Sequence, residues 1–106
     1  ARLTFSGHIH QPTLYFISRQ GRASPQVFYP TPGATLPLLS SRQWLAIVGS
    51  VGQPRDGNPA ASYAICDRRQ NTLTYFRVPY DRAKTAQKIL AAGLPPSLAR
   101  RLERGY

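Results

Sequence analysis

Hydrophobic residues up to residue 80 fall in segments of strand length, which either alternate with polar residues at a period of two or are nearly continuous apolar runs. Such stretches lie at residues 2–6, 14–18, 26–29, 43–48, 61–67 and 72–80, with a strand or an irregular segment at 36–39. Glycine and proline interrupt the pattern between them, as in turns. Arg68 to Asn71 has the length of a hairpin connection. The pattern predicts six or seven strands between residues 2 and 80, and the nearly apolar segment 43–48 is expected to be buried.

The period changes after residue 80. Asp81 is a suitable helix N-cap, and apolar residues then recur on one helical face. Gly93 supplies a stop signal, and Pro95 with Pro96 suits the first turn of a second helix. The sequence therefore predicts two short C-terminal helices, at about residues 81–92 and 95–104.

Short links between the predicted strands favour an antiparallel or mixed sheet over repeated β-α-β units. With 106 residues the chain has the length of one domain, and the expected class is α+β. Two short helices cannot cover both faces of a sheet. A second layer from elsewhere is therefore expected.

The charge is strongly positive, with 14 Lys and Arg against 4 Asp and Glu, a formal +10. Such a surface attracts polyanions, and aromatic strand residues could stack on bases, which makes a small nucleic-acid-binding module one candidate. The aromatic residues in question are Tyr29, Tyr75 and Phe76. No run of five basic residues and no recognised nucleic-acid motif accompanies them, so a solvated basic surface is the simpler interpretation.

The single cysteine, Cys66, excludes an internal disulfide and fits a reducing compartment, so we expect a cytoplasmic protein. No apolar run approaches the roughly 20 residues that span a bilayer. A strand-like segment begins directly after Ala1. We therefore expect a fragment, whose N-terminal part was cut away, omitted or encoded separately.

The only two histidines, His8 and His10, stand two residues apart at the end of the first predicted strand. In extended backbone such residues project to the same side, so both rings are expected to face one pocket while Ile9 points into the core. Gly7 would permit an unusual backbone or a close neighbour. Neutral imidazole is a common metal ligand. The alternative is two exposed polar residues at a strand end.

The segment from Gly49 to Pro59 is a long loop rich in glycine and proline. It has two interpretations. In the first, its Gly and Pro residues only shape a tight connection. Alternatively, Arg55 and the backbone around Gly52 and Gln53 could receive a phosphate group, although the segment lacks the Lys-[Ser/Thr] ending of a P-loop.

Several segments resemble calcineurin-like metallophosphoesterases. Gly7 to His10 resembles the family's G-H-[TS]-H motif, with isoleucine in place of the small hydroxyl residue. Gly49 to Ile65 is similar to a segment of one bacterial and archaeal branch, the phosphodiesterase or diadenosine-tetraphosphatase-like enzymes. Arg77 to Asp81 and Ala91 to Pro95 are similar to the closing part of that branch. The resemblance covers nearly the whole chain, in family order.

This resemblance implies the C-terminal part of a four-layer α/β/β/α sandwich spanning residues 1–106. It implies two divalent metal ions (manganese, iron or zinc), with His8 binding one and His10 the other. The family's other ligand motifs are absent, so we expect the isolated chain to be inactive. The substrate would be a phosphate ester or a nucleotide, and the missing N-terminal part or a separate chain would complete the site. A structural subunit that pairs with such a chain is a further possibility.

Overall fold

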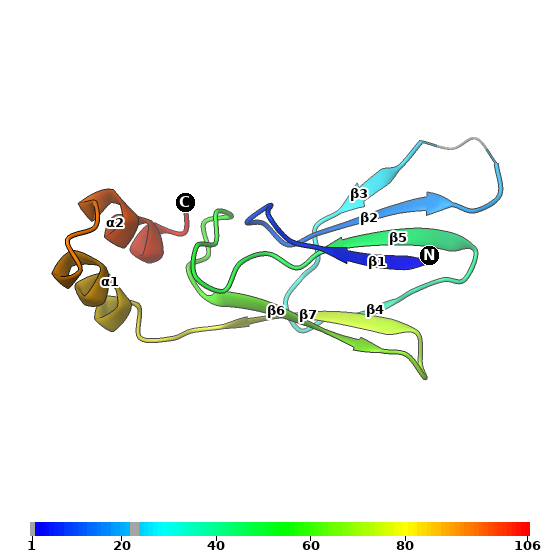
Figure 1. Ribbon diagram of the computed structural model, residues 1–106. Helices are drawn as coiled ribbons and strands as arrows, with labels where there is room; N and C mark the ends of the chain where they lie inside the picture. Colours follow the sequence, from blue (N-terminus) through cyan, green and yellow to red (C-terminus); the bar gives the residue numbers. More distant parts are fainter. Residues whose placement is uncertain (1, 22–23) are drawn as a thin grey trace.

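The computed structural model describes residues 2–21 and 24–106. In this part of the chain, seven strands precede two helices (Figure 1). The elements are β1 (Leu3–Ser6), β2 (Thr13–Ser18), β3 (Gln26–Phe28), β4 (Thr35–Pro37), β5 (Arg42–Ile47), β6 (Ala61–Asp67), β7 (Thr72–Val78), α1 (Arg82–Ala91) and α2 (Pro96–Arg104). The α+β class with two C-terminal helices is confirmed.

The strands form two sheets, whereas the hydrophobic pattern alone indicated one antiparallel or mixed sheet. One sheet has the order β1-β5-β2-β3 and the other the order β4-β7-β6. The strand β1 pairs in parallel with β5, and the other pairs are antiparallel. Alternation of apolar residues shows which side of a strand faces a core, but it does not show to which sheet the strand belongs.

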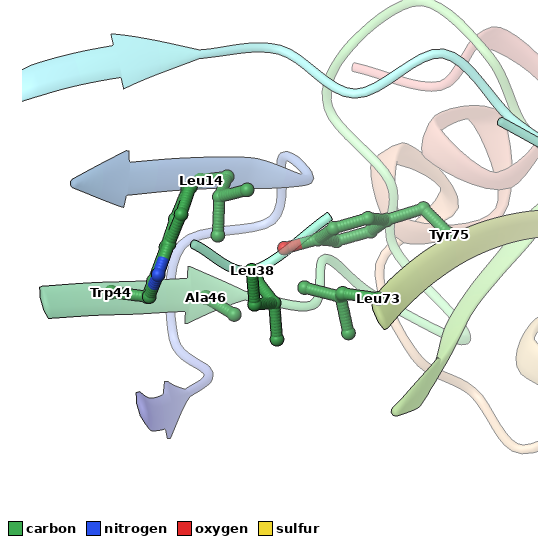
Figure 2. Close-up of a cluster of buried hydrophobic side chains, with 6 residues drawn as sticks. All are labelled: Leu14, Leu38, Trp44, Ala46, Leu73 and Tyr75. Carbon is green, nitrogen blue, oxygen red and sulfur yellow. The ribbon is translucent and has the colours of Figure 1, made fainter. Parts of the chain in front are cut away.

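The main core lies between the two sheets (Figure 2). Leu14, Trp44 and Ala46 project from the four-stranded sheet, and Leu73 and Tyr75 project from the three-stranded one. The hydroxyl group of Tyr75 donates a hydrogen bond of 3.3 Å to the backbone carbonyl of a residue on the opposite sheet, Thr13. Burial of large apolar side chains, at about 1.5–3 kcal/mol each, joins the two sheets.

The strand β5 is fully buried on one face and only in part on the other. Trp44 and Ala46 face the core, whereas Gln43 and Leu45, on the opposite face, are exposed and Ile47 is buried. The prediction that the whole of 43–48 is buried was therefore wrong at Gln43 and Leu45. These two residues line an open hollow on the outer face of the sheet.

The two helices pack against each other at the end of the molecule (Figure 1). Asp81 caps α1 as predicted, because its carboxylate accepts a hydrogen bond of 3.0 Å from the backbone amide of Lys84. The side chains between the helices are Ala86, Ile89, Ala99 and Leu102. Among the described residues, no helix is long and apolar enough to cross a bilayer. The molecule measures 53 × 27 × 20 Å along its principal axes.

Candidate functional site

Two loops leave neighbouring strands at the same end of the four-stranded sheet. Residues 7–12, the histidine loop, follow β1, and residues 48–60, the glycine loop, follow β5. Because β1 and β5 are parallel neighbours, with Ser6 opposite Ile47, both loops begin at carboxyl ends of strands (Figure 1). Sheets that contain parallel strands usually bind ligands at the carboxyl ends of these strands.

His8 is the central residue of a three-residue γ-turn. The Ile9 amide donates a hydrogen bond of 2.8 Å to the carbonyl of Gly7, and His8 has a φ of 70°. A γ-turn with a positive central φ is rare and strained, and such strain concentrates at functional sites. The histidines therefore do not lie in extended backbone, and the alternation argument for their common side was wrong.

The neighbours of His8 also differ from the expectation. Ile9 is 48% exposed, so it does not point into the core. A Cβ atom on Gly7 would meet no atom within 4 Å, and the φ of Gly7 is not positive. The unusual backbone conformation is therefore that of His8, which has the positive φ, and not that of Gly7.

His10 is tied to the glycine loop at two points. Its Nδ1 atom lies 2.7 Å from the carbonyl oxygen of Gln53, and its own carbonyl accepts a hydrogen bond of 2.9 Å from the Arg55 amide. A carbonyl can only accept, so the proton of the neutral ring belongs on Nδ1. The electron pair of the ring is then on Nε2. This arrangement is typical of a histidine that ligates a metal through one nitrogen while a carbonyl orients the other.

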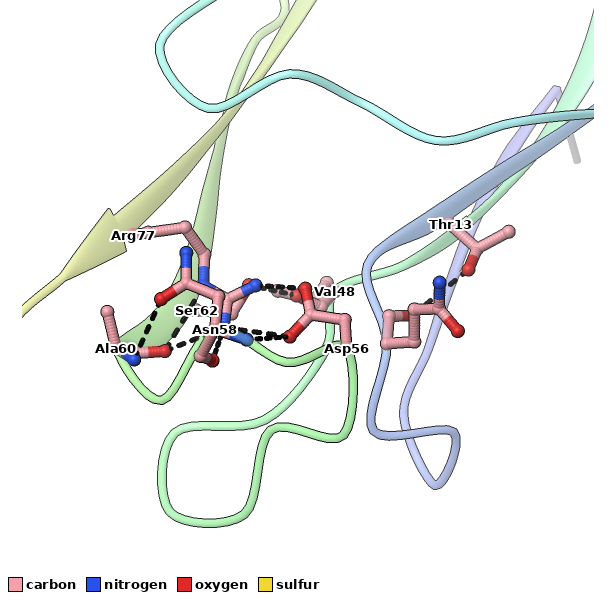
Figure 3. Close-up of polar contacts among 8 residues, drawn as sticks. Thr13, Val48, Asp56, Asn58, Ala60, Ser62 and Arg77 are labelled. Atoms are coloured by element: carbon pink, nitrogen blue, oxygen red, sulfur yellow. Dashed lines mark hydrogen bonds and ion pairs between the residues drawn. The ribbon is translucent and has the colours of Figure 1, made fainter. Parts of the chain in front are cut away.

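The start of the glycine loop is tightly packed. Gly49 has a φ of 95°, and a Cβ atom there would lie 2.9 Å from atoms of both Pro12 and Ser62. The hydroxyl group of Ser62 donates to the carbonyl of Val48 at 2.6 Å (Figure 3). The Ser62 amide donates to the carbonyl of Ser50 at 2.9 Å. These contacts fix the glycine loop against β6 and against the histidine loop.

The second half of the glycine loop is held by Arg77 from β7 (Figure 3). The guanidinium group of Arg77 forms an ion pair with Asp56 and donates to the backbone carbonyls of Asn58 and Ala60. We call these four residues the arginine clamp. Sequence analysis did not identify it. The signal was present, because Arg77 shares its strand parity with the buried Leu73 and Tyr75, and a buried guanidinium requires acceptors.

The three residues considered for phosphate binding have different environments. Gly52 is exposed, and a Cβ atom there would meet no atom within 4 Å. Gln53 is half-buried and uses its carbonyl for His10. Arg55 is exposed, and its amide is already bonded to the histidine loop. Of these three residues, Arg55 alone carries a charge, and its backbone is held next to His10.

His10 suits a metal ligand, but the donor set is small. In residues 2–21 and 24–106, no group of three or more His, Cys, Asp and Glu residues could hold a metal ion. A catalytic zinc ion, for comparison, takes three protein ligands and keeps one open position. The described residues therefore do not fit a metal ion by themselves.

Solved structures with a similar fold include a metallophosphoesterase. A metallophosphoesterase from Sphaerobacter thermophilus is 39% identical, with a TM-score of 0.83, over 99% of this chain. The chain is similar to part of a metallophosphoesterase. This similarity supports the resemblance to the calcineurin-like family, and it includes both the histidine loop and the glycine loop.

The similarity concerns less than half of each relative. The chain spans 42% of the Sphaerobacter thermophilus metallophosphoesterase. It is also 36% identical over 100 residues to an uncharacterized protein, MJ0912, of Methanocaldococcus jannaschii, of which it spans 38%. No protein-family model matches the chain.

Proposed function

We propose that this chain is part of a metal-dependent phosphoesterase, to which it contributes the imidazoles of His8 and His10 as metal ligands. The observation that carries the proposal is the similarity to a metallophosphoesterase over 99% of the chain at a TM-score of 0.83. The position of both histidines beyond the carboxyl end of β1 supports it. The branch we favour is the phosphodiesterase or diadenosine-tetraphosphatase-like one.

The two histidines suit different ions of a dinuclear manganese, iron or zinc centre. His10 has an electron pair on Nε2 because its Nδ1–H is engaged by Gln53. His8 adopts a strained turn that exposes its ring. Divalent ions in such centres activate water and neutralise phosphoryl oxygens. The remaining ligands must come from polypeptide outside this chain, since the described residues offer no group of three.

Arg55 is the residue we propose for substrate contact. Its guanidinium is exposed, while its amide is held on the histidine loop. Arginine matches phosphate oxygens with paired donors, so it suits a phosphomonoester, a phosphodiester or a nucleotide polyphosphate. Gly52 leaves open space through which such a group could approach the loop backbone. Gln53 contributes by orienting His10.

We propose that the missing ligands arrive on polypeptide that continues the two sheets, from the same protein or from a separate chain. In the described part of the chain, β1 and β6 are each the outermost strand of a sheet and have a partner strand on one side only. Residues of both strands line a hollow of about 480 Å³. Phe5, which lines the hollow, is 49% exposed. An uncharged, apolar edge such as β1 is usually paired or covered.

Nucleic-acid binding is the second candidate, and the +10 charge favours it. The aromatic residues give it less support than the sequence suggested. Tyr75 is 1% exposed and cannot stack on a base. Phe76 is stacked on Tyr63, with ring centroids 5.0 Å apart. A salt-dependent mobility shift with single-stranded DNA, without any phosphoesterase activity in a completed protein, would favour this candidate.

A chimera tests the phosphoesterase proposal. In it, this chain replaces the matched segment of the Sphaerobacter thermophilus protein. We expect metal-dependent hydrolysis of p-nitrophenyl phosphate or bis-p-nitrophenyl phosphate, lost in His8→Ala and in His10→Ala. The isolated chain should show no turnover above buffer. A folded chimera without activity, or activity of the isolated chain that vanishes in His8→Ala, would contradict the proposal.

The same chimera tests Arg55. Arg55→Ala should lower kcat/KM by about ten-fold or more, as expected for loss of a charge-assisted contact to phosphate, and should leave the melting temperature nearly unchanged. Arg69→Ala is the matched control, because Arg69 is also an exposed loop arginine but lies in the β6–β7 turn. An unchanged kcat/KM in Arg55→Ala would exclude a substrate role.

A further inference from the structure

The arginine clamp anchors the glycine loop. The Arg77 side chain is 7% exposed and that of Asp56 is 19% exposed. Beyond its ion pair, Arg77 donates to the carbonyl of Ala60 from Nε at 3.1 Å and from Nη2 at 2.9 Å, and Nη2 also donates to Oδ1 of Asp56 at 3.2 Å. One guanidinium therefore holds three separate points of the loop.

The strand that carries Arg77 is well fixed. The strand β7 is the middle strand of its sheet and pairs with both β4 and β6. Arg77 stands opposite Ser62 in the register of β6 and β7. Because the guanidinium donors have a rigid, planar arrangement, Arg77 holds the glycine loop in a fixed position relative to the sheet.

The loop is stiff between the clamp and His10. Asp56 directly follows Arg55, whose amide donates to the carbonyl of His10. The carbonyl that accepts the His10 Nδ1–H belongs to Gln53. Pro54, between Gln53 and Arg55, is fully buried. Proline has a fixed φ, so few free torsions separate Asp56 from the carbonyl of Gln53.

We infer that Arg77 and Asp56 are positioning residues for His10. By fixing the carbonyl of Gln53 they hold the imidazole as the Nδ1–H tautomer, with its electron pair on Nε2. Neither residue touches the ring. The benefit for metal binding rests on the proposed function, whereas the effect on the tautomer is a property of this chain alone.

Asp67 provides a matched control. Like Asp56 it is an aspartate beside a turn, and its Oδ1 accepts from the amides of Arg69 at 2.9 Å and Gln70 at 3.1 Å. It lies at the opposite end of β6 from the glycine loop. Asp67→Asn should therefore affect local stability without affecting the His10 ring.

The test is nitrogen-15 NMR of the chain with labelled histidine, at about pH 9, where imidazole is neutral. In the wild type, Nδ1 of His10 should show the signal of a protonated nitrogen and Nε2 that of an unprotonated one. Asp56→Asn and Arg77→Lys should lower the ratio of the Nδ1–H to the Nε2–H tautomer by about three- to ten-fold, as for loss of one hydrogen bond. Asp67→Asn should leave it unchanged, and His8 serves as an internal reference.

Thermal melting monitored by circular dichroism establishes that each variant is folded. If Asp56→Asn does not fold, Asp56→Glu replaces it, since that change retains the charge but displaces it from Arg77 by one methylene group. A wild-type His10 that is mainly the Nε2–H tautomer, or folded clamp variants with an unchanged ratio, would overturn the inference. Because no metal is present in this test, its failure is distinct from failure of the phosphoesterase proposal.

Discussion

At residue 49 the backbone leaves β5 with a φ of 95°, and atoms of Pro12 and Ser62 occupy the space where a side chain would begin. Both constraints act near the start of the glycine loop, which carries Gln53 and Arg55. Positive φ disfavours any residue with a Cβ atom. The neighbours cannot easily retreat, because Pro12 is rigid and Ser62 is bonded to Val48. This single position therefore sets the direction of the glycine loop.

Gly49→Ala should destabilise the chain by about 1–3 kcal/mol, the usual range for backbone strain combined with overpacking. Gly52→Ala is the matched control in the same loop, since its Cβ would meet no atom within 4 Å and its φ is not positive. That change should remain within about 0.5 kcal/mol of the wild type. Urea unfolding measures both values, and equal stabilities for the two variants would contradict the packing described at Gly49.

Tyr75 makes the stability depend on alkaline pH. Burial raises the pKa of its phenol from 10.0 to about 12. Between these values the folded chain keeps a proton that the unfolded chain releases, so the free energy of unfolding decreases by up to about 1.4 kcal/mol per pH unit. The contribution is complete below about pH 10 and is lost as the pH rises to about 12.

Urea unfolding at about pH 9, 10 and 11 tests this dependence. Stability of the wild type should decrease more steeply with pH than that of Tyr75→Phe, which lacks the ionising group. The baseline of the variant will also differ, because the hydrogen bond to Thr13 is lost. The comparison is therefore between slopes, and parallel slopes would mean that the phenol is not shielded from water as described.

At the residue scale, the direction of the two histidines could not be predicted. The spacing of His8 and His10 led to the prediction that both rings face one pocket, and that argument failed because it assumed extended backbone. The turn at His8 depends on the hydrogen bond from Ile9 to Gly7, which no hydrophobic pattern reveals. The arginine clamp joins residues 21 positions apart, and its partners are specified by the fold rather than by local sequence.

Among the elements, the helix pair is connected to the candidate site through its last residues. Gly105, with a φ of 71°, follows α2, and its carbonyl accepts a hydrogen bond of 2.9 Å from the Gly57 amide in the glycine loop. A Cβ atom on Gly105 would lie 3.0 Å from backbone atoms of Asn58. The residue that follows α2 therefore contacts the same loop that the arginine clamp holds.

Gly105→Ala should break the hydrogen bond between the Gly57 amide and the carbonyl of residue 105, while α1 and α2 remain packed against each other. The expected cost is about 1–3 kcal/mol, since a left-handed residue and a close backbone approach are both affected. Hydrogen exchange provides the measurement. The Gly57 amide should lose protection, whereas the Ala92 amide, which donates to Lys88 at the end of α1, should retain it. Continued protection of Gly57 would contradict the proposed contact.

Local elements could be predicted well from the sequence. The hairpin of β6 and β7 and both helices depend on nearby signals, such as the turn after Asp67 and the cap at Asp81. The division into two sheets could not be predicted in this way. It depends on pairing of β1 with β5, in which Leu3 lies opposite Trp44, far away along the chain.

At the scale of the whole molecule, the strand edges that lack a partner lie near the histidine loop. The unpaired edges of β1 and β6 flank one hollow, and the histidine loop begins where β1 ends. Polypeptide that added strands to these edges would reach the carboxyl end of β1, where it could bring ligands to His8 and His10. The span of 42% of the Sphaerobacter thermophilus protein leaves ample length for such a complement.

The most direct test is the metal content of the chimera described above, measured by elemental analysis after dialysis. The account predicts two divalent ions per chain in the parent chimera, as in dinuclear phosphoesterase centres, and a loss of bound metal in both His8→Ala and His10→Ala. Cooperative thermal unfolding would establish that each protein is folded. Full metal content in the folded histidine variants would contradict the central claim that this chain supplies ligands to the centre.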